Sequence, residues 1–397
     1  MQSFYAQFES QPAPNLNGKL TLNVLGHVPT NPIDEIFYEN RGRPVTVETP
    51  DGQQTIDGIE RIKVYSASIN WEQKWFSLDG FYRTGHYHWG YEGDFFGLYP
   101  EANYGPNIDI YNGNAPLGFE IAGKKQLEGL KVAFGPELWW GANPAVLIKY
   151  RRDLGPITMT GIYQEDLDKQ LQTVSSFAVP VPPTRKATLQ METKYGIFGF
   201  KAGGIWSGST KEGQTFQLVS GEPGNYKILQ DKIKDSDAFG GKVKITVSSG
   251  RWNWYAEGSA QGLVADGYVN QALTFTGWRL KDPGIGNHYA LLSGLNVLFG
   301  DFQIAPNFLW QKPIEGPIPS DVPPPGRPRN ILDDPFAVLG NREMTAGELL
   351  ITYDPTPATW MYAWDNDERE DAKLAFSTGV IFRHQPTTRD ASIGISA

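Results

Sequence analysis

The sequence contains no cysteine, which excludes disulfide bridges and thiolate metal sites. It also has no run approaching about 18 consecutive apolar residues, which excludes a transmembrane helix. A membrane location remains compatible with this absence, because a barrel strand crosses the bilayer with about 9–11 residues of alternating character. Residues 1–4 lack the charged start and apolar segment of a signal peptide, so we expect that an exported chain has already lost its signal.

Positive charge is also in short supply, with 35 basic against 44 acidic residues and a formal net charge of −9. A chain of this sign repels a phosphate backbone, so we exclude nucleic acid as a main partner. The sequence has no glycine-rich phosphate loop and no GxSxG nucleophile elbow. Carboxylate pairs such as Glu165 and Asp166 lie in predicted loops, where solvated charge explains them. We therefore expect that the protein is not an enzyme and that it binds no cofactor.

Aromatic residues and turn-formers are abundant: 12 Trp, 18 Tyr, 21 Phe, 44 Gly and 29 Pro. This composition favours strands and turns over helices. Apolar and polar residues alternate in many segments, as at 188–195 and 198–203, and again at 242–248 and 252–259. Such alternation predicts strands with one apolar and one polar face. Short turns separate the strands within each pair.

The connections between these hairpins are of two lengths. Turns of about two to five residues alternate with long connections near 28–60, 88–115, 165–186, 209–239 and 314–346. We predict an all-β fold, a transmembrane antiparallel up-and-down β-barrel of about 16–18 strands, with short turns on one rim and long loops on the other. The barrel would form a single domain over residues 1–397. A soluble antiparallel protein with one buried face is the alternative.

The hairpin rhythm and loop asymmetry resemble those of bacterial outer-membrane porins and of the alginate-export type of barrel, over most of the chain. This resemblance implies an outer-membrane location, surrounded by lipid. It carries no signature motif, so it implies nothing about individual residues or the solute.

The most unusual segment is 81–111, which interleaves aromatic rings with carboxylates and amides. Rings stack on the apolar face of a sugar while polar groups bond its hydroxyls, so this segment is a candidate saccharide site. The alternative is an aromatic girdle running into a loop that packs on itself. Two imidazoles with nearby carboxylates also resemble part of a metal shell, although we predict no metal. The candidate ligand-binding residues are Tyr82, Arg83, His86, His88, Trp89, Tyr91, Glu92 and Asp94.

Charged residues also fall on the polar faces of predicted strands, where a barrel would direct them into its lumen. They would either attract an anionic solute or neutralise one another in pairs, and we favour pairing. The predicted lumen-facing residues are Lys149, Arg151, Glu192, Lys201, Lys242, Lys244 and Glu257.

The predicted function is passage or capture of a polar, saccharide-like solute across the outer membrane. One alternative is a plugged structural barrel that anchors a cell-envelope or surface protein complex. A second alternative is a soluble all-β protein that binds or cleaves carbohydrate.

Overall fold

A computed structural model provides the fold, and it describes residues 3–26, 45–50, 52–56, 61–96, 99, 102–104, 116–139, 142–168, 185–207, 215–222, 225–232, 239–261, 271–274, 277–280, 287–313, 344–355 and 376–384. These residues form strands and one short 3-10 helix, η1 (Lys125–Leu127). In the described part of the chain, no helix is long and apolar enough to span a membrane. Most of the proline-rich stretch at 313–328 and of the predicted connection near 314–346 lies outside the described residues, whereas residues 215–222, 225–232 and 239 of the predicted connection near 209–239 are described.

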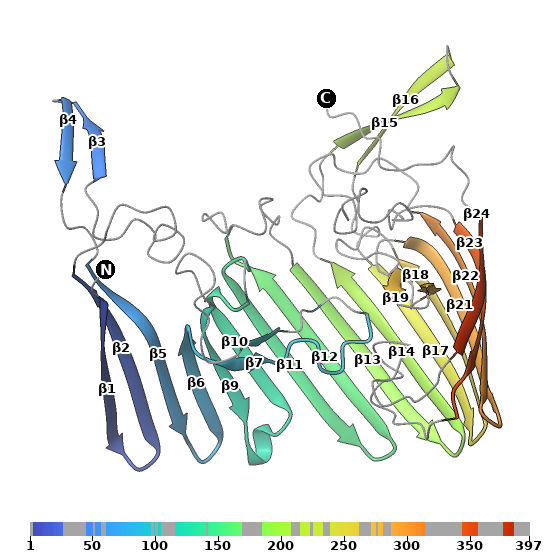
Figure 1. The fold of residues 1–397 in the computed structure, drawn as a ribbon, viewed down its shortest axis with the longest axis horizontal. Helices are drawn as coiled ribbons and strands as arrows, with labels where there is room; N and C mark the ends of the chain where they lie inside the picture. Colours follow the sequence, from blue (N-terminus) through green and yellow to red (C-terminus); the bar gives the residue numbers. More distant parts are fainter. Residues whose placement is uncertain are drawn as a thin grey trace. The chain divides into compact units, whose positions relative to one another are not determined.

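Sixteen strands form one sheet in which each strand lies beside its neighbours along the chain (Figure 1). They are β1 (Ser3–Ala13), β2 (Leu16–Leu25), β5 (Ile62–Glu72), β6 (Phe76–Tyr82), β9 (Leu117–Gly123), β10 (Leu130–Glu137), β11 (Ala145–Leu154), β12 (Ile157–Asp166), β13 (Arg185–Tyr195), β14 (Phe198–Ser207), β17 (Phe239–Ser249), β18 (Trp252–Gln261), β21 (Asn287–Phe299), β22 (Phe302–Pro313), β23 (Met344–Tyr353) and β24 (Phe376–His384). The predicted all-β, up-and-down antiparallel arrangement is confirmed, and its strand number lies within the predicted 16–18.

The remaining strands form separate two-stranded sheets in the connections. They are β3 (Val45–Thr49) with β4 (Gly52–Ile56), β7 (His86–His88) with β8 (Ala102–Tyr104), β15 (Thr215–Glu222) with β16 (Asn225–Lys232), and β19 (Gln271–Thr274) with β20 (Gly277–Leu280).

Short turns join the strands at one set of ends. Gly155, Gly196 and Gly300 adopt positive φ angles of 65°, 58° and 61° in three of these turns, a conformation that glycine adopts without steric cost. Successive turns are hydrogen-bonded neighbours: the Lys124 amide donates to the Trp75 carbonyl at 2.7 Å. The connection of residues 354–375, between β23 and β24, is longer than the others at these ends.

The two faces of the sheet differ in polarity. Paired residues such as Phe200 and Ile245 place apolar side chains on one face, and their neighbours Lys201 and Lys244 on the other. Large apolar side chains are exposed on or beside nearly every strand of the sheet. By contrast, many fully buried residues are polar, among them Lys149, Gln190 and Glu257, which alternation places on the polar face. Other residues of the chain therefore cover parts of the polar face, whereas the apolar face is exposed.

The chain divides into two compact units, which are described separately below. Unit 1 comprises Met1–Glu92, Tyr99–Arg151 and Ile162–Pro183, and unit 2 comprises Gly93–Leu98, Arg152–Gly161 and Thr184–Ala397. The expectation of a single domain over 1–397 stays a prediction.

Candidate functional site

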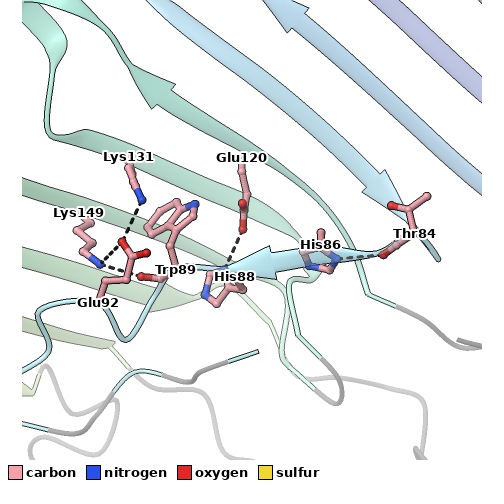
Figure 2. Close-up of polar contacts among 8 residues, drawn as sticks. All are labelled: Thr84, His86, His88, Trp89, Glu92, Glu120, Lys131 and Lys149. Atoms are coloured by element: carbon pink, nitrogen blue, oxygen red, sulfur yellow. Dashed lines mark hydrogen bonds and ion pairs between the residues drawn. The ribbon is translucent and has the colours of Figure 1, made fainter. Parts of the chain in front are cut away.

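Part of the polar face of unit 1 is covered by the segment that follows β6, residues 83–92, which contains β7. Figure 2 shows this segment beside the side chains of β9, β10 and β11. The His86 ring stacks on Phe81 of β6, with ring centroids 3.8 Å apart and planes inclined by 21°. The aromatic character of the segment therefore serves, first of all, to pack it onto the sheet.

His88, the last residue of β7, is fully buried. Its Nδ1 lies 2.9 Å from the Glu120 carboxylate on β9, and its ring centroid lies 5.5 Å from that of Trp89 and 5.2 Å from that of Trp139. A buried imidazole gains from a hydrogen-bonded carboxylate, because the alternative is an unsatisfied polar group. Glu120 is thus a positioning residue for the segment.

Two lysines, Lys131 and Lys149, contact both Trp89 and Glu92. Lys131 on β10 and Lys149 on β11 lie directly opposite each other in the sheet, and their Nζ atoms lie 5.2 and 5.6 Å from the Trp89 ring centroid. Lys149 is 2% exposed, and its Nζ donates to the Trp89 carbonyl at 2.7 Å. The Glu92 carboxylate lies 3.0 Å from Lys131 Nζ and 3.8 Å from Lys149 Nζ, so one carboxylate bridges both ammonium groups (Figure 2).

Two groups in this cluster have shifted pKa values, Glu92 and His86. Burial alone would raise the pKa of the Glu92 carboxyl, but the hydrogen bond and charge of Lys131 and the charge of Lys149 outweigh burial and lower it. Burial lowers the pKa of the His86 imidazole, although the Thr84 carbonyl and the Glu120 charge oppose that shift. Glu92 therefore keeps its charge at neutral pH, while His86 is neutral.

In unit 2, residues 94–96 cover the polar face of β13, β14 and β17. The Phe95 amide donates to Gln190 Oε1 at 2.7 Å, and Lys242 Nζ donates to the Phe95 carbonyl at 3.1 Å. Phe96 is buried against Gly203, where an added Cβ would lie 2.9 Å from the Phe96 ring. Gly203 thus leaves the space that Phe96 occupies.

A row of charges crosses four strands of unit 2. Glu192, Lys201, Lys244 and Glu257 are successive cross-strand partners on β13, β14, β17 and β18. Lys201 Nζ lies 2.9 Å from Glu192, and Lys244 Nζ lies 3.3 Å from Glu257. Glu257 is buried and also lies 2.6 Å from Lys242 Nζ. Pairing therefore dominates this row, but its two lysines are adjacent to each other.

Each unit carries a groove on its polar face. The groove of unit 1 holds about 670 Å³ and is lined by Glu9, Ser10, Gln11, Asn17, Gly18, Lys19, Ser68, Ile69, Asn70, Asp79, Gly80, Phe81, Thr84, Gly85, His86, Tyr87 and Glu120. The groove of unit 2 holds about 630 Å³ and is lined by Asp94, Phe95, Pro156, Thr158, Glu192, Thr193, Lys194, Gly199, Phe200, Lys201, Lys244 and Thr246.

The structure brings together some of the predicted ligand-binding residues and separates others. His86, His88, Trp89 and Glu92 lie in one cluster in unit 1 (Figure 2), and Asp94 lines the groove of unit 2. Three others lie outside that cluster. Tyr82 alternates with Phe81 and so lies on the apolar face, Arg83 covers the Tyr65 ring at 4.9 Å, and Tyr91 meets Tyr87 edge to face. A ligand-binding role for any of them stays a prediction.

The predicted lumen-facing residues all belong to the sheet. Arg151 lies near the turn end of β11, where its amide donates to the Gly129 carbonyl at 2.9 Å. Lys149 and Lys242 are buried beneath residues 83–96, whereas Lys201 and Lys244 line a groove. Within the described residues, no group of three or more His, Asp or Glu side chains could hold a metal ion.

Residues 83–96, called the docked segment below, contact three residues that sequence reasoning missed: Glu120, Gln190 and Gly203. Glu120 alternates with Phe119 and Ile121, so its polar-face position could be read from the sequence. Its pairing with His88, 32 residues away, depends on how the segment folds back, which alternation does not encode.

Known proteins match this chain only among solved structures. No family model matches it, and no curated protein matches it. Among solved structures, Pseudomonas aeruginosa OpdK with vanillate is 9% identical, with 96% of this chain and 87% of that chain covered and a TM-score of 0.34. Salmonella typhi OmpF in complex with daunomycin is 11% identical, with 96% and 90% covered and a TM-score of 0.29. A mutant of Rh. blastica porin is 8% identical, with 78% and 84% covered and a TM-score of 0.28. Similarities this weak support no statement about location or solute.

Proposed function

We propose that the chain is a bacterial outer-membrane β-barrel, closed by pairing of β1 with β24, whose polar face lines a water-filled passage for polar solutes. The observation that carries this proposal is the inverted polarity of the sheet. A soluble antiparallel sheet packs its apolar face against a core and leaves its polar face in water. Here residues 83–96 cover parts of the polar face, while apolar side chains such as Phe8, Phe134, Ile245 and Phe308 are exposed.

Exposed apolar surface on this scale needs an apolar solvent. Soluble proteins seldom expose contiguous apolar patches larger than a few hundred Å². Lipid satisfies such a face, and a closed sheet satisfies every backbone hydrogen bond within the bilayer. The same polar lining that suits a channel lumen would be a poor protein core, because its lysines and carboxylates need water or partners.

The solute that we propose is uncharged or weakly charged and rich in hydroxyl groups, as a saccharide is. The groove of unit 1 supports this choice, because amides, hydroxyls and carboxylates of β1, β2, β5 and β6 line it together with Tyr87 and His86. Trp89 is buried against Lys131 and Lys149, whereas Tyr87 is 38% exposed, so Tyr87 is the better placed ring for stacking on a sugar. No bond-breaking step is part of this proposal.

The first experiment purifies the chain with and without detergent and compares boiled with unboiled samples on a gel. Detergent dependence and a heat-induced mobility shift are expected of a membrane barrel. Planar-bilayer conductance and liposome swelling in glucose, maltose and raffinose then test passage. A monodisperse protein without detergent would overturn the barrel. A heat-modifiable barrel that conducts no current would be a plugged scaffold, and the channel function would fail.

A charge placed on the apolar face tests the lipid contact directly. Ile245→Arg should cost about 2–4 kcal/mol of folding free energy in lipid vesicles, because Ile245 lies within β17 on the apolar face. Tyr195→Arg is the matched control, since Tyr195 is the last residue of β13, beside a turn, where the same charge should cost about 0–1 kcal/mol. Equal costs at both positions would argue against a bilayer around the sheet.

A further inference from the structure

Two pairs of lysines lie directly opposite each other on the polar face, one in each unit. Lys131 faces Lys149 across β10 and β11, and Lys201 faces Lys244 across β14 and β17. Like charges directly opposite each other in a sheet are destabilising unless a counter-charge lies between or beside them. Each pair therefore marks a place where the sheet favours an anionic group.

In unit 1 the protein supplies that group from its own chain. The Glu92 carboxylate reaches down from residues 83–92 and lies 3.0 and 3.8 Å from the two ammonium groups. This arrangement shows, within the same molecule, what a carboxylate does when it meets an opposed lysine pair.

In unit 2 the opposed pair borders an open groove instead. Carboxylates flank it on the outer strands, Glu192 beside Lys201 and Glu257 beside Lys244, and Asp94 also lines the groove. Lys194 adds a third ammonium group, and the hydroxyls of Thr158, Thr193 and Thr246 complete the polar lining. The Lys201 side chain is 49% exposed and lines the groove, while its Nζ lies 2.9 Å from the Glu192 carboxylate.

We propose that the groove of unit 2 binds the carboxylate of a small, hydroxyl-bearing anionic solute at Lys201 and Lys244. The solute carboxylate takes the place that Glu92 takes between Lys131 and Lys149, and its hydroxyls meet the threonines. This inference deepens the proposed function by adding acidic solutes to those that the passage accepts, and it rests on that function only for the transport that would follow binding.

Binding of gluconate, with sorbitol as its uncharged counterpart, tests the proposal in the detergent-solubilised, full-length protein. At low ionic strength, calorimetry should detect gluconate and not sorbitol, and added salt should weaken the binding. Lys201→Gln should weaken gluconate binding about tenfold, and the double variant Lys201→Gln/Lys244→Gln should abolish it. The heat-induced gel shift reports whether each variant has folded.

The matched control is Lys124→Gln. Lys124 also pairs with a carboxylate, that of Glu72, and is 38% exposed, but it lines neither groove. Gluconate binding should be unchanged in this variant. Equal losses at Lys124 and Lys201, equal binding of sorbitol, or no gluconate binding by the folded parent would each overturn the proposal.

Bilayer recordings separate this inference from the proposed function. If the protein binds gluconate through Lys201 but conducts no current, the proposed binding site is supported and the proposed channel function is overturned. If the protein conducts current but binds no gluconate, the channel function is supported and the proposed binding site is overturned.

Discussion

At the scale of single residues, the docked segment depends on a few charged side chains held in places with little water. Lys149 has almost no contact with solvent, so its ammonium group relies on the Trp89 carbonyl, the Trp89 ring and Glu92. Removing one partner of a buried charge costs more than the pair itself contributes, because the remaining charge is left without compensation.

Glu92→Gln should therefore loosen residues 86–92 by about 1–2 kcal/mol while leaving the strands intact. Hydrogen exchange at the backbone amides of these residues measures the change. Glu9→Gln is the control, because the Glu9–Lys19 pair is exposed and such pairs contribute little. Unchanged hydrogen exchange in Glu92→Gln would mean that the contacts of Glu92 with Lys131 and Lys149 do not stabilise the docked segment.

Acidification should release the same segment in two stages. The pKa of His86 is lower in the docked segment than its ordinary value of 6.5, so docking weakens as the pH falls below about 6.5. The pKa of Glu92 is also lowered, from an ordinary 4.5, so its contribution is present above about pH 4.5 and is lost below it. Hydrogen exchange between pH 7.5 and 4, corrected for intrinsic rates, measures both stages.

His86→Phe separates the two stages. The phenyl ring can keep the stack on Phe81 but cannot take up a proton, so the first stage should disappear and the second should remain. A first stage that persists in this variant would show that a group other than His86 is responsible for it.

At the scale of elements, docking also requires empty space on the sheet. Gly203→Val should push Phe96 out of its site, because the new side chain would meet the Phe96 ring and the Leu189 carbonyl. We expect faster exchange of the Phe95 amide, by about tenfold or more, as its bond to Gln190 opens. Gly347→Val should have no such effect, since nothing lies within 4 Å of its added Cβ.

The sequence predicted the strands well and the docked segment poorly, for a physical reason. Alternation over 188–195 or 242–248 reflects a local requirement, because each residue's face is set by its neighbours along the chain. The turns at Gly196 and Gly300 are equally local. By contrast, the contact of Trp89 with two lysines depends on residues 42 and 60 positions away, and no short pattern records such a contact.

The same limit applies to the candidate site residues. Lys149 and Lys201 both read as polar-face lysines in the sequence, yet one is sealed by Trp89 and the other lines a groove. Only the path of residues 83–96 distinguishes them.

At the scale of the whole molecule, closure of the sheet is open to a direct test. The chain has no cysteine, so introduced pairs react without background. Phe8→Cys combined in turn with Thr378→Cys, Val380→Cys or Phe382→Cys should form a disulfide in at least one case, because closure would place β1 beside β24 within bonding distance. Gel mobility without reductant reports the bond.

Two further pairs calibrate this experiment. Phe8→Cys with Leu20→Cys is the positive control, since the two are cross-strand partners in β1 and β2. Phe8→Cys with Met191→Cys is the negative control. A bond in the positive control, with none in any β1–β24 pair, would contradict closure.

The long reach of residues 94–96 has a consequence for the order in which the molecule assembles. Strand neighbours are close in sequence, so hairpins can form and join one after another along the chain. The bonds of Phe95, however, span 95 residues to Gln190 and 147 residues to Lys242. They cannot form until β13, β14 and β17 exist, so docking is a late kinetic step. We therefore expect a folding intermediate in which the strands are already paired but residues 94–96 do not yet cover the polar face.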